Sequence, residues 1–157
     1  MPFWVKIRTM ETTLPSAIQA LPATVLTPAL STPSTDAIAA EVPVALVFNG
    51  ISHAVMMCTP QNLEAFALGF ALSEGIIDGI EVCYGIEVAA AHVSGNDGDL
   101  PSIHVEITIA TRCFARLKEK RRTLAGRTGC GVCGIDSMDA LDMVPEPLQL
   151  PAWAYSI

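Results

Sequence analysis

The sequence predicts an α+β fold, an antiparallel sheet carrying its helices on one face, and three observations support this prediction. β-rich and helical segments follow one another after Glu41 in the order ββαββα. Hydrophobic residues make up 51% of the 157 residues and charged residues only 16%, so the chain can bury a core. An Asn-Gly pair, Asn49-Gly50, separates the first two β-rich segments and is the strongest short hairpin signal.

The first 40 residues are expected to form a mobile extension rather than part of the domain. Residues 9–40 are rich in Pro, Thr, Ala and Ser and show no sustained period, so we expect at most a short turn of helix there. They offer no apolar face, and we expect residues 1–38 to contribute nothing to the core. Order is expected to begin at Glu41, and the domain to span residues 41–157.

The segments after Glu41 carry their own start and stop signals. Residues 42–48 and 51–58 are β-rich and flank the Asn-Gly turn. Thr59 and Pro60 suit the N-cap and first position of a helix, because a hydroxyl can accept from a free N–H and proline has no N–H to satisfy. Gly75 is a typical residue just past a helix end. Strands are expected over 82–93 and 102–111, and a second helix over about 112–124, ending at Gly126.

Positive charge is concentrated in one segment of an otherwise acidic chain. The formal net charge is −7, which argues against a general nucleic-acid-binding protein. Seven of the nine Lys and Arg residues nevertheless lie between Arg112 and Arg127, where Glu119 is the only acid; the rest of the chain holds 15 acids and 2 bases. This asymmetry can steer an anionic ligand or an acidic partner to the segment.

The cysteines and the hydropathy pattern predict where the protein works. Five cysteines are an odd number in a chain large enough to form its own core, so no disulfide scaffold is expected. Prolines interrupt the apolar stretch that follows Lys6 and Arg8, so we expect no secretory signal. No run approaches the roughly 20 apolar residues that span a bilayer. We therefore expect a cytoplasmic protein with no membrane partner.

The stretch LAGRTGCGVCGID, residues 124–136, holds Cys130 and Cys133 among four glycines, and four interpretations are open. Structural zinc takes four ligands, and the other Cys and His residues form no second close pair. A thioredoxin-like dithiol lies at a helix N-terminus after a strand, whereas this pair follows a predicted helix. The two thiols could also be incidental. A zinc-holding module that binds or assembles a client without catalysis is the alternative function.

The fourth interpretation is a sulfur-handling nucleophile, and the neighbouring residues favour it. A thiolate must attack a donor persulfide, and nearby cations such as Arg127 favour the thiolate. The persulfide so formed carries a transferable outer sulfur, and a second cysteine can attack the inner sulfur, expel sulfide and leave a disulfide. The glycines permit unusual φ angles, so we expect the loop at 126–134 to be mobile and accessible.

Two longer stretches carry a family resemblance. EVPVALVFNGISHAVMMCTPQNLEAFALGFALSEGII (41–77) and RLKEKRRTLAGRTGCGVCGI (116–135) closely resemble the formate dehydrogenase accessory sulfurtransferase family, FdhD. The resemblance runs from about Glu41 to the C-terminus and is far more specific than C-x-x-C alone. It implies that Cys130 corresponds to the persulfide cysteine of the family and Cys133 to its partner.

The resemblance also implies a cofactor and partners. In the family a cysteine desulfurase donates sulfur, which the protein passes to the molybdenum bis-guanylate cofactor before that cofactor enters formate dehydrogenase. The cofactor is thus a sulfur acceptor, and no tightly bound cofactor or metal is expected. Arg121, Arg122 and Arg127 are candidate ligands for its pyrophosphates, because arginine binds phosphate oxygens bidentately. A homodimer is an assembly that the sequence leaves open.

Family members continue beyond the resemblance through a cytidine-deaminase-like domain that contributes a cofactor-binding loop. This chain stops at Ile157, 24 residues after Cys133, and so resembles only the N-terminal part. A truncated gene product, one half of a split protein and a degraded copy each fit this pattern. Little formate dehydrogenase maturation is expected from this chain alone.

The remaining polar and sulfur-containing residues have structural interpretations. Cys58, Cys83 and Cys113 are expected to be buried small apolar side chains. His53 and His104 lie in β-rich segments, where we expect hydrogen-bonded core or face residues rather than ligands. Methionines 56 and 57 are expected to pack, because methionine adapts to irregular core space.

Overall fold

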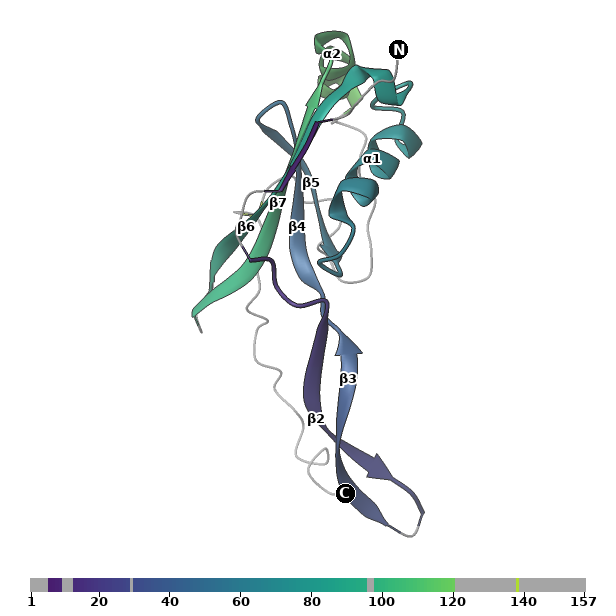
Figure 1. The fold of residues 1–157 in the computed structure, drawn as a ribbon, viewed down its shortest axis with the longest axis vertical. Helices are drawn as coiled ribbons and strands as arrows, with labels where there is room; N and C mark the ends of the chain where they lie inside the picture. Colours follow the sequence, from purple (N-terminus) through teal and green to yellow (C-terminus); the bar gives the residue numbers. More distant parts are fainter. Residues whose placement is uncertain (1–5, 10–12, 29, 96–97, 121–137, 139–157) are drawn as a thin grey trace, which may run out of the picture.

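The computed structural model describes residues 6–9, 13–28, 30–95, 98–120 and Met138. The elements are, in chain order, β1 (Lys6–Thr9), β2 (Ile18–Leu26), β3 (Ser31–Ala39), β4 (Val42–Phe48), β5 (Ile51–Cys58), α1 (Leu63–Ser73), a 3₁₀ turn η1 (Ile80–Val82), β6 (Cys83–Gly95), β7 (Gly98–Ile109) and α2 (Thr111–Lys120). Five strands form one sheet in the order β1-β6-β7-β4-β5, and β2 and β3 form a separate ribbon (Figure 1). The α+β class is as predicted.

The main sheet is mixed, which corrects the prediction of an antiparallel sheet. Two antiparallel hairpins, β4–β5 and β6–β7, lie side by side, and β4 pairs with β7 in parallel, from Val44 opposite Ile103 to Phe48 opposite Ile107. β1 adds to β6, also in parallel. The parallel pairing arises because the crossover through α1 returns the second hairpin with its second strand next to β4. Local patterns do not encode which strand of a hairpin becomes the neighbour.

The turn between β4 and β5 is the hairpin that the Asn-Gly pair predicts. Asn49 has φ 48° and Gly50 has φ 78°, so both turn residues are in the left-handed region. Such a two-residue turn matches the twist of the flanking strands. Phe48 and Ile51 accordingly pair directly across the turn.

A β-bulge in this hairpin explains the burial of His53. The register shifts between Leu46, opposite Ala54, and Val47, opposite Ser52, which leaves His53 as the extra residue. The imidazole is only 4% exposed and lies edge-on to Phe48 and Phe70, with ring centroids 5.6 and 6.1 Å away. The expectation that His53 is a core residue is confirmed.

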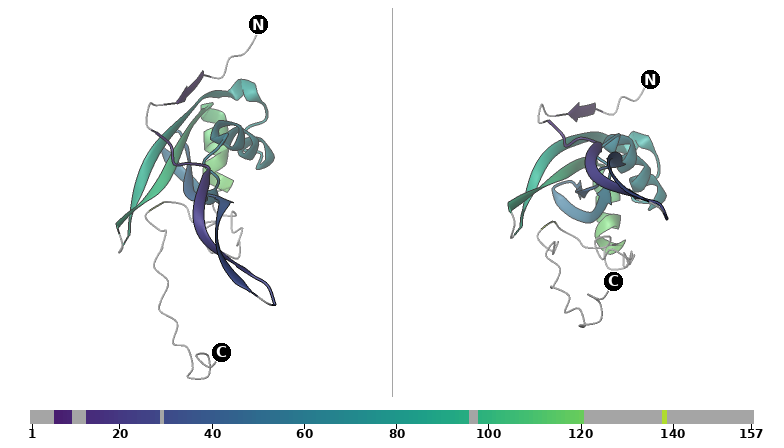
Figure 2. Two further views of the ribbon diagram at one scale, coloured as in Figure 1. Left: turned by 60° about the horizontal axis from the view of Figure 1, so that its bottom comes forward. Right: turned by 90° about the horizontal axis from the view of Figure 1, so that it is seen from below.

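The core lies between one face of the sheet and the two helices. Alternate residues of β4, β6 and β7 point into it, the fully buried ones including Leu46, Phe48, Ile86, Val105 and Ile107. The helices complete the core with Leu63, Ala67 and Ala71 of α1 and with Cys113 and Leu117 of α2. Figure 2 shows α1 lying along the sheet on this side. Full burial of each large aliphatic side chain contributes about 1.5–3 kcal/mol, so this cluster dominates the stability of the fold.

Helix α1 ends as predicted but begins later. β5 continues to Cys58, the Gln61 N–H donates to the Thr59 carbonyl at 2.7 Å, and Asn62, not Thr59, is the N-cap, with φ 53°. Gly75, at φ 60°, is the residue just past the end. Its N–H donates to the Leu72 carbonyl at 3.0 Å and that of Ile76 to the Ala71 carbonyl at 2.9 Å, which is a Schellman motif.

The expectation of no regular structure before Glu41 is wrong. β2 and β3 pair in antiparallel over nine residues each, from Ile18 opposite Ala39 to Leu26 opposite Ser31, and this arm, residues 18–39, projects away from the main sheet (Figures 1 and 2). Leu14, before the arm, packs against the core, so the extension also contributes there. The arm has no local sequence pattern typical of strands, because nearly every arm side chain is exposed and a strand exposed on both faces has no hydrophobic alternation. The division into an extension and a domain stays a prediction.

Among the described residues, no helix combines the length and the apolar character needed to cross a membrane.

Candidate functional site

The residues predicted to carry the chemistry lie outside the described part of the chain. Cys130, Cys133, Arg121, Arg122 and Arg127 all fall within 121–137, and so does the predicted loop at 126–134. The structure describes α2, the helix that leads to them, and α2 ends ten residues before Cys130. The structure therefore shows how the residues directly before this segment are held.

The first turns of α2 are fixed to one end of the sheet. The Ala110 N–H donates to the Val82 carbonyl at 2.9 Å, and the Ala110 carbonyl accepts from the N–H groups of Cys113 and Phe114 at 2.9 and 3.1 Å. Cys113 and Leu117, one helical turn apart, are buried in the core. The predicted start of this helix near Arg112 is confirmed, and its predicted end at Gly126 lies outside the described residues.

Arg116 ties α2 to the segment that follows α1. Its Nη1 lies 3.0 Å from Asp78 Oδ1, and its Nη2 donates to the Ile76 carbonyl at 2.9 Å. The hydrogen bond and the charge of Asp78 raise the pKa of the Arg116 guanidinium. Because this side chain spans two elements, Arg116 is a structural cation, whereas Arg112 is exposed to solvent.

Asn49 connects the β4–β5 turn to the same end of the sheet. Its side-chain Nδ2 donates to the Ile109 carbonyl at 3.0 Å, and its Oδ1 accepts from the Ile109 N–H at 2.8 Å. Both main-chain groups of the last residue of β7 are thus satisfied by one amide. The asparagine of the turn therefore also fixes the point from which α2 departs.

Glu106 makes a second contact to this turn. Its Oε1 accepts from the Gly50 N–H at 2.7 Å, and on the sheet it lies opposite Glu87 of β6. The pKa of the Glu106 carboxyl is raised, chiefly by burial and also by the charge of Glu87. The Gly50 hydrogen bond and the charge of His104 act in the opposite direction but do not cancel this rise. Glu87 and Glu106 lie on the face away from α1, because their neighbours Ile86 and Ile107 face the core.

The cysteines in the described residues are unsuited to nucleophilic work. Cys83 and Cys113 are buried, as predicted, and burial raises the pKa of the Cys83 thiol, with a weaker opposing effect from its contact to the Gly85 carbonyl. Cys58 is half-buried, more open than predicted. Cys83 and Cys113 carry free thiols.

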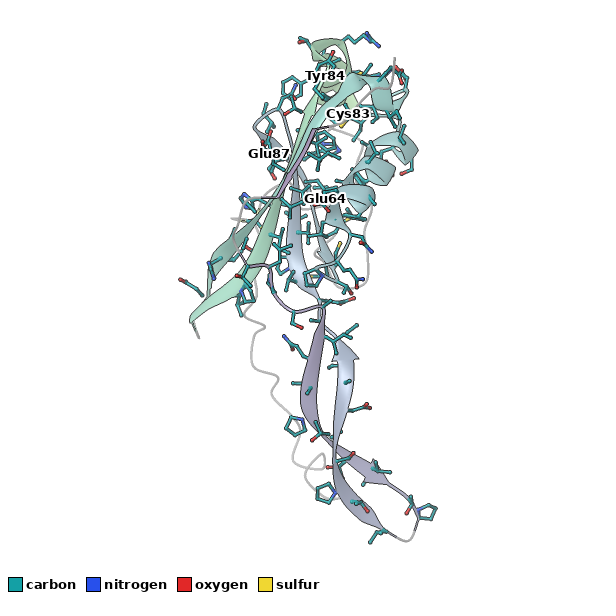
Figure 3. The ribbon with its side chains drawn as sticks, viewed as in Figure 1. Glu64, Cys83, Tyr84 and Glu87 are labelled. Carbon is teal, nitrogen blue, oxygen red and sulfur yellow. The ribbon has the colours of Figure 1, made fainter. Side chains whose placement is uncertain are left out.

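Tyr84 of β6 and His104 of β7 are exposed to solvent. Figure 3 shows Cys83 and Tyr84 at the start of β6 next to α2, and the Tyr84 side chain is 57% exposed. His104, on the outer face of β7, is exposed, which agrees with the expectation of a face residue. Within the described part of the chain no three His, Cys, Asp or Glu side chains gather as a metal site.

Sequence reasoning missed the residues that hold α2 in place. Arg116 and Asp78 are 38 positions apart, and Asn49 and Ile109 are 60 apart, so no local pattern links them. Asn49 was identified only as a turn former. For Arg116 the sequence contains one indication: this basic residue lies on the same helical face as the apolar positions Cys113 and Leu117.

The chain is similar in sequence to known proteins. The chain is 59% identical over 113 residues to the sulfur carrier protein FdhD of Burkholderia mallei, covering 72% of this chain and 40% of that protein. It is 52% identical over 122 residues to the sulfur carrier protein FdhD of Chromobacterium violaceum, covering 78% of this chain and 42% of that protein. The chain thus spans about two fifths of the length of these curated relatives.

A solved structure is also similar, at a lower level. It is the crystal structure of a Desulfotalea psychrophila protein described as a formate dehydrogenase accessory protein, with 19% sequence identity and a TM-score of 0.45, over 60% of this chain and 35% of that one. The family model for FdhD/NarQ matches residues 39–156, which is most of the chain and includes α2 and both Cys130 and Cys133. The chain belongs to the FdhD/NarQ family.

Proposed function

We propose that this protein is a sulfur carrier that accepts sulfur as a persulfide on Cys130. The observation that carries the proposal is the family match over residues 39–156, together with relatives at 50–59% identity that are named sulfur carrier protein FdhD. The donor is a cysteine desulfurase, and the acceptor is the molybdenum bis-guanylate cofactor of formate dehydrogenase. The chain spans about two fifths of the length of those relatives.

The proposed chemistry uses the two cysteines in different roles. The Cys130 thiolate attacks the outer sulfur of the donor persulfide, a Cys130 persulfide forms, and the donor leaves as a thiolate. If Cys133 then attacks the Cys130 sulfur, the outer sulfur departs as sulfide and a Cys130–Cys133 disulfide remains. A dithiol reductant must reduce that disulfide before the next cycle. Cys133 thereby governs how long the transferable sulfur is held.

The three described cysteines support the choice of Cys130 as the sulfur acceptor, because they are less suited to that role. A sulfur acceptor needs an accessible thiolate, whereas Cys113 is buried and the Cys83 thiol is both buried and raised in pKa. Cys58 is half-buried at the end of β5. The cationic segment around Arg127, by contrast, favours a thiolate at Cys130.

The test is to incubate the full chain with a cysteine desulfurase and cysteine and to locate persulfide by mass spectrometry. Cys130→Ala should abolish protein-bound persulfide, whereas Cys133→Ala should still accept sulfur but release it more slowly. Cys58→Ala, the most exposed of the described cysteines, is the matched control and should behave as the unmodified chain. Undiminished persulfide in Cys130→Ala would overturn the proposal. Stoichiometric zinc that is released when the thiols are blocked would instead support the alternative of a zinc-holding binding or assembly module.

The cofactor contact is proposed for Arg121, Arg122 and Arg127. Guanosine diphosphate, which shares the guanosine and pyrophosphate of the cofactor, is a direct probe in titration calorimetry. Replacing the three arginines by alanine should weaken its binding at least tenfold, because each bidentate arginine–phosphate pair is a charge-assisted hydrogen bond. Arg112→Ala, which removes an exposed charge from α2, is the control and should change the affinity little.

A further inference from the structure

An exposed apolar patch lies on the body of the molecule, away from the arm. The apolar patch consists of Leu72 at the end of α1, Ile80 in η1 and Tyr84 at the start of β6, which are 39%, 48% and 57% exposed. Every other exposed large apolar side chain in the described part of the chain belongs to the arm. Exposed apolar side chains that are confined to one short stretch, residues 72–84, are typical of an interaction site.

The stretch that carries the apolar patch is fixed to the start of α2. The Schellman motif reverses the chain directly after α1. Asp78 then pairs with Arg116 of α2 at 3.0 Å, and the Val82 carbonyl accepts from the Ala110 N–H at 2.9 Å. Ile80 lies between these two contacts. The end of α1, the start of β6 and α2 accordingly meet at one end of the sheet (Figures 1 and 3).

The border of the apolar patch is acidic. Glu74, Asp78 and Glu81 are all exposed, and no Lys or Arg occurs between residues 72 and 84. The side chain of Glu81 turns back over the main chain next to Ile80, because a Cβ added at residue 79, a glycine, would lie 2.7 Å from its carboxylate carbon. A partner that covers the patch therefore meets negative charge at its border and must supply positive charge there.

Cys130 can reach a partner that is bound at this end of the sheet. α2 ends at Lys120, ten residues before Cys130, and Lys120 is about 6 Å along the helix from Arg116. Ten residues span at most about 35 Å when they are fully extended. A protein seated on the apolar patch, next to the Arg116–Asp78 ion pair, is therefore within the reach of the proposed sulfur acceptor.

We propose that the apolar patch and its acidic border are the docking surface for the sulfur donor, and that the donor covers them with an apolar pocket bordered by Lys or Arg side chains. This inference rests on the proposed function, because it assigns to the patch the partner that must reach Cys130. A tyrosine and two aliphatic side chains inside a charged rim have the composition of an interface centre. The donor must leave after each transfer, so the contact is weak and lies at the low end of interface sizes.

The test is titration calorimetry of a cysteine desulfurase with the full chain carrying Cys130→Ala, so that docking is measured without sulfur transfer. Adding Ile80→Asp should weaken binding roughly tenfold or more, because it places a charge in the centre of the contact. Adding Glu81→Lys should weaken binding severalfold and reduce its dependence on salt.

Matched controls come from exposed positions outside the patch. Leu26→Asp, in the arm, controls for the loss of an exposed apolar side chain, and Glu41→Lys controls for the reversal of an exposed charge. Both should bind as tightly as the chain with Cys130→Ala alone. Thermal unfolding identifies any variant that does not fold, and Glu81→Lys keeps the test decisive if Ile80→Asp is such a variant.

A kinetic measurement separates this inference from the proposed function. In chains that retain Cys130, Ile80→Asp should raise the KM for the chain roughly tenfold and leave the maximal rate of Cys130 persulfide formation unchanged, because the patch does not touch the reacting sulfurs. If the unmodified chain forms the persulfide while Ile80→Asp and Glu81→Lys bind and react as it does, the docking surface is wrong and the proposed function stands. No persulfide on Cys130 of the unmodified chain would instead count against the proposed function. Absence of binding in the calorimetry, or equal weakening by the control variants, would overturn the docking surface.

Discussion

The main sheet and the arm are both hydrogen-bonded β-structure, but they differ in what surrounds the strands. In β4 every residue except Val47 is buried, whereas in β3 every residue is exposed. Main-chain pairing is complete in both, so pairing alone does not distinguish them. The difference is the apolar area removed from water, which supplies the larger part of the stabilisation. The stability of the fold should therefore depend on the sheet and be nearly independent of the arm.

The largest difference in the free energy of unfolding is expected between an Ile→Ala substitution in the main sheet and the same substitution in the arm. Ile107→Ala, in β7, the central strand of the main sheet, should lower the free energy of unfolding by about 3 kcal/mol, through lost burial and the cavity left behind. Ile38→Ala in β3 should change it by less than about 0.5 kcal/mol, because this side chain is exposed. Urea unfolding of the two variants and of the unmodified chain measures both changes in the free energy of unfolding. Equal losses at the two positions would contradict the distinction between the regions.

The next effect concerns the connection of the sheet to α2. Asn49→Ala should cost about 2 kcal/mol, because both main-chain groups of Ile109 lose their side-chain partner and alanine disfavours the positive φ. Asn49→Gly keeps the φ angle and isolates the loss of the hydrogen bonds. Thermal unfolding measures the cost, and amide exchange of α2 should accelerate in both variants. If Asn49→Gly is as stable as the unmodified chain, the amide does not fix this junction.

A smaller, pH-dependent effect is expected from Glu106. Its pKa is raised above the ordinary 4.5, chiefly by burial, so the folded state binds more protons than the unfolded state just above that pH. This group therefore contributes a loss of stability as the pH rises from about 4.5 through the folded pKa. Glu106→Gln removes the titration, so its stability relative to the unmodified chain should increase between pH 4 and pH 7. Glu87→Gln, which removes the neighbouring charge, should lessen the same slope, and parallel profiles for all three proteins would contradict this account.

The smallest effect on global stability is expected in the arm itself. Amide protons of β2 and β3 should exchange through local opening, without global unfolding, because almost no apolar area is buried there. Those of β4 and β7 should exchange only through global unfolding. Hydrogen exchange followed by mass spectrometry measures both rates. Equal exchange rates in the arm and in the main sheet would contradict this prediction.

Elements with a strong local signal were predictable from the sequence. Asn49-Gly50 specifies positive φ at two successive residues, and Gly75 specifies it at a helix end, so both features follow from backbone sterics alone. Residues 82–93 and 102–111 are β-rich, which predicted strands there, and in the structure the buried positions of β7 alternate with period two from Ile103 to Ile109. The start of α1 was misplaced because Thr59 and Pro60 have the chemistry of a helix start, while the ladder of β5 extends to Cys58.

Long-range features were not predictable in the same way. The parallel pairing of β4 with β7 and the Arg116–Asp78 ion pair depend on the packed fold rather than on neighbouring residues. The arm was missed because its strands contain proline and small residues and have no buried face. The candidate site was predicted from chemistry and family resemblance; the described residues supply only its base.

The parallel pairing of β4 with β7 also has a consequence for the order in which the protein folds. Val44 pairs with Ile103, a separation of 59 residues, so the inner edge of β4 has no partner until β7 has been synthesised. At about 5–20 residues per second, a ribosome takes roughly 3–12 s to cover that separation. During this interval the first hairpin exposes an apolar edge in the nascent chain. Binding by chaperones should therefore be strongest before residue 109 leaves the ribosome and weaker once the sheet can close.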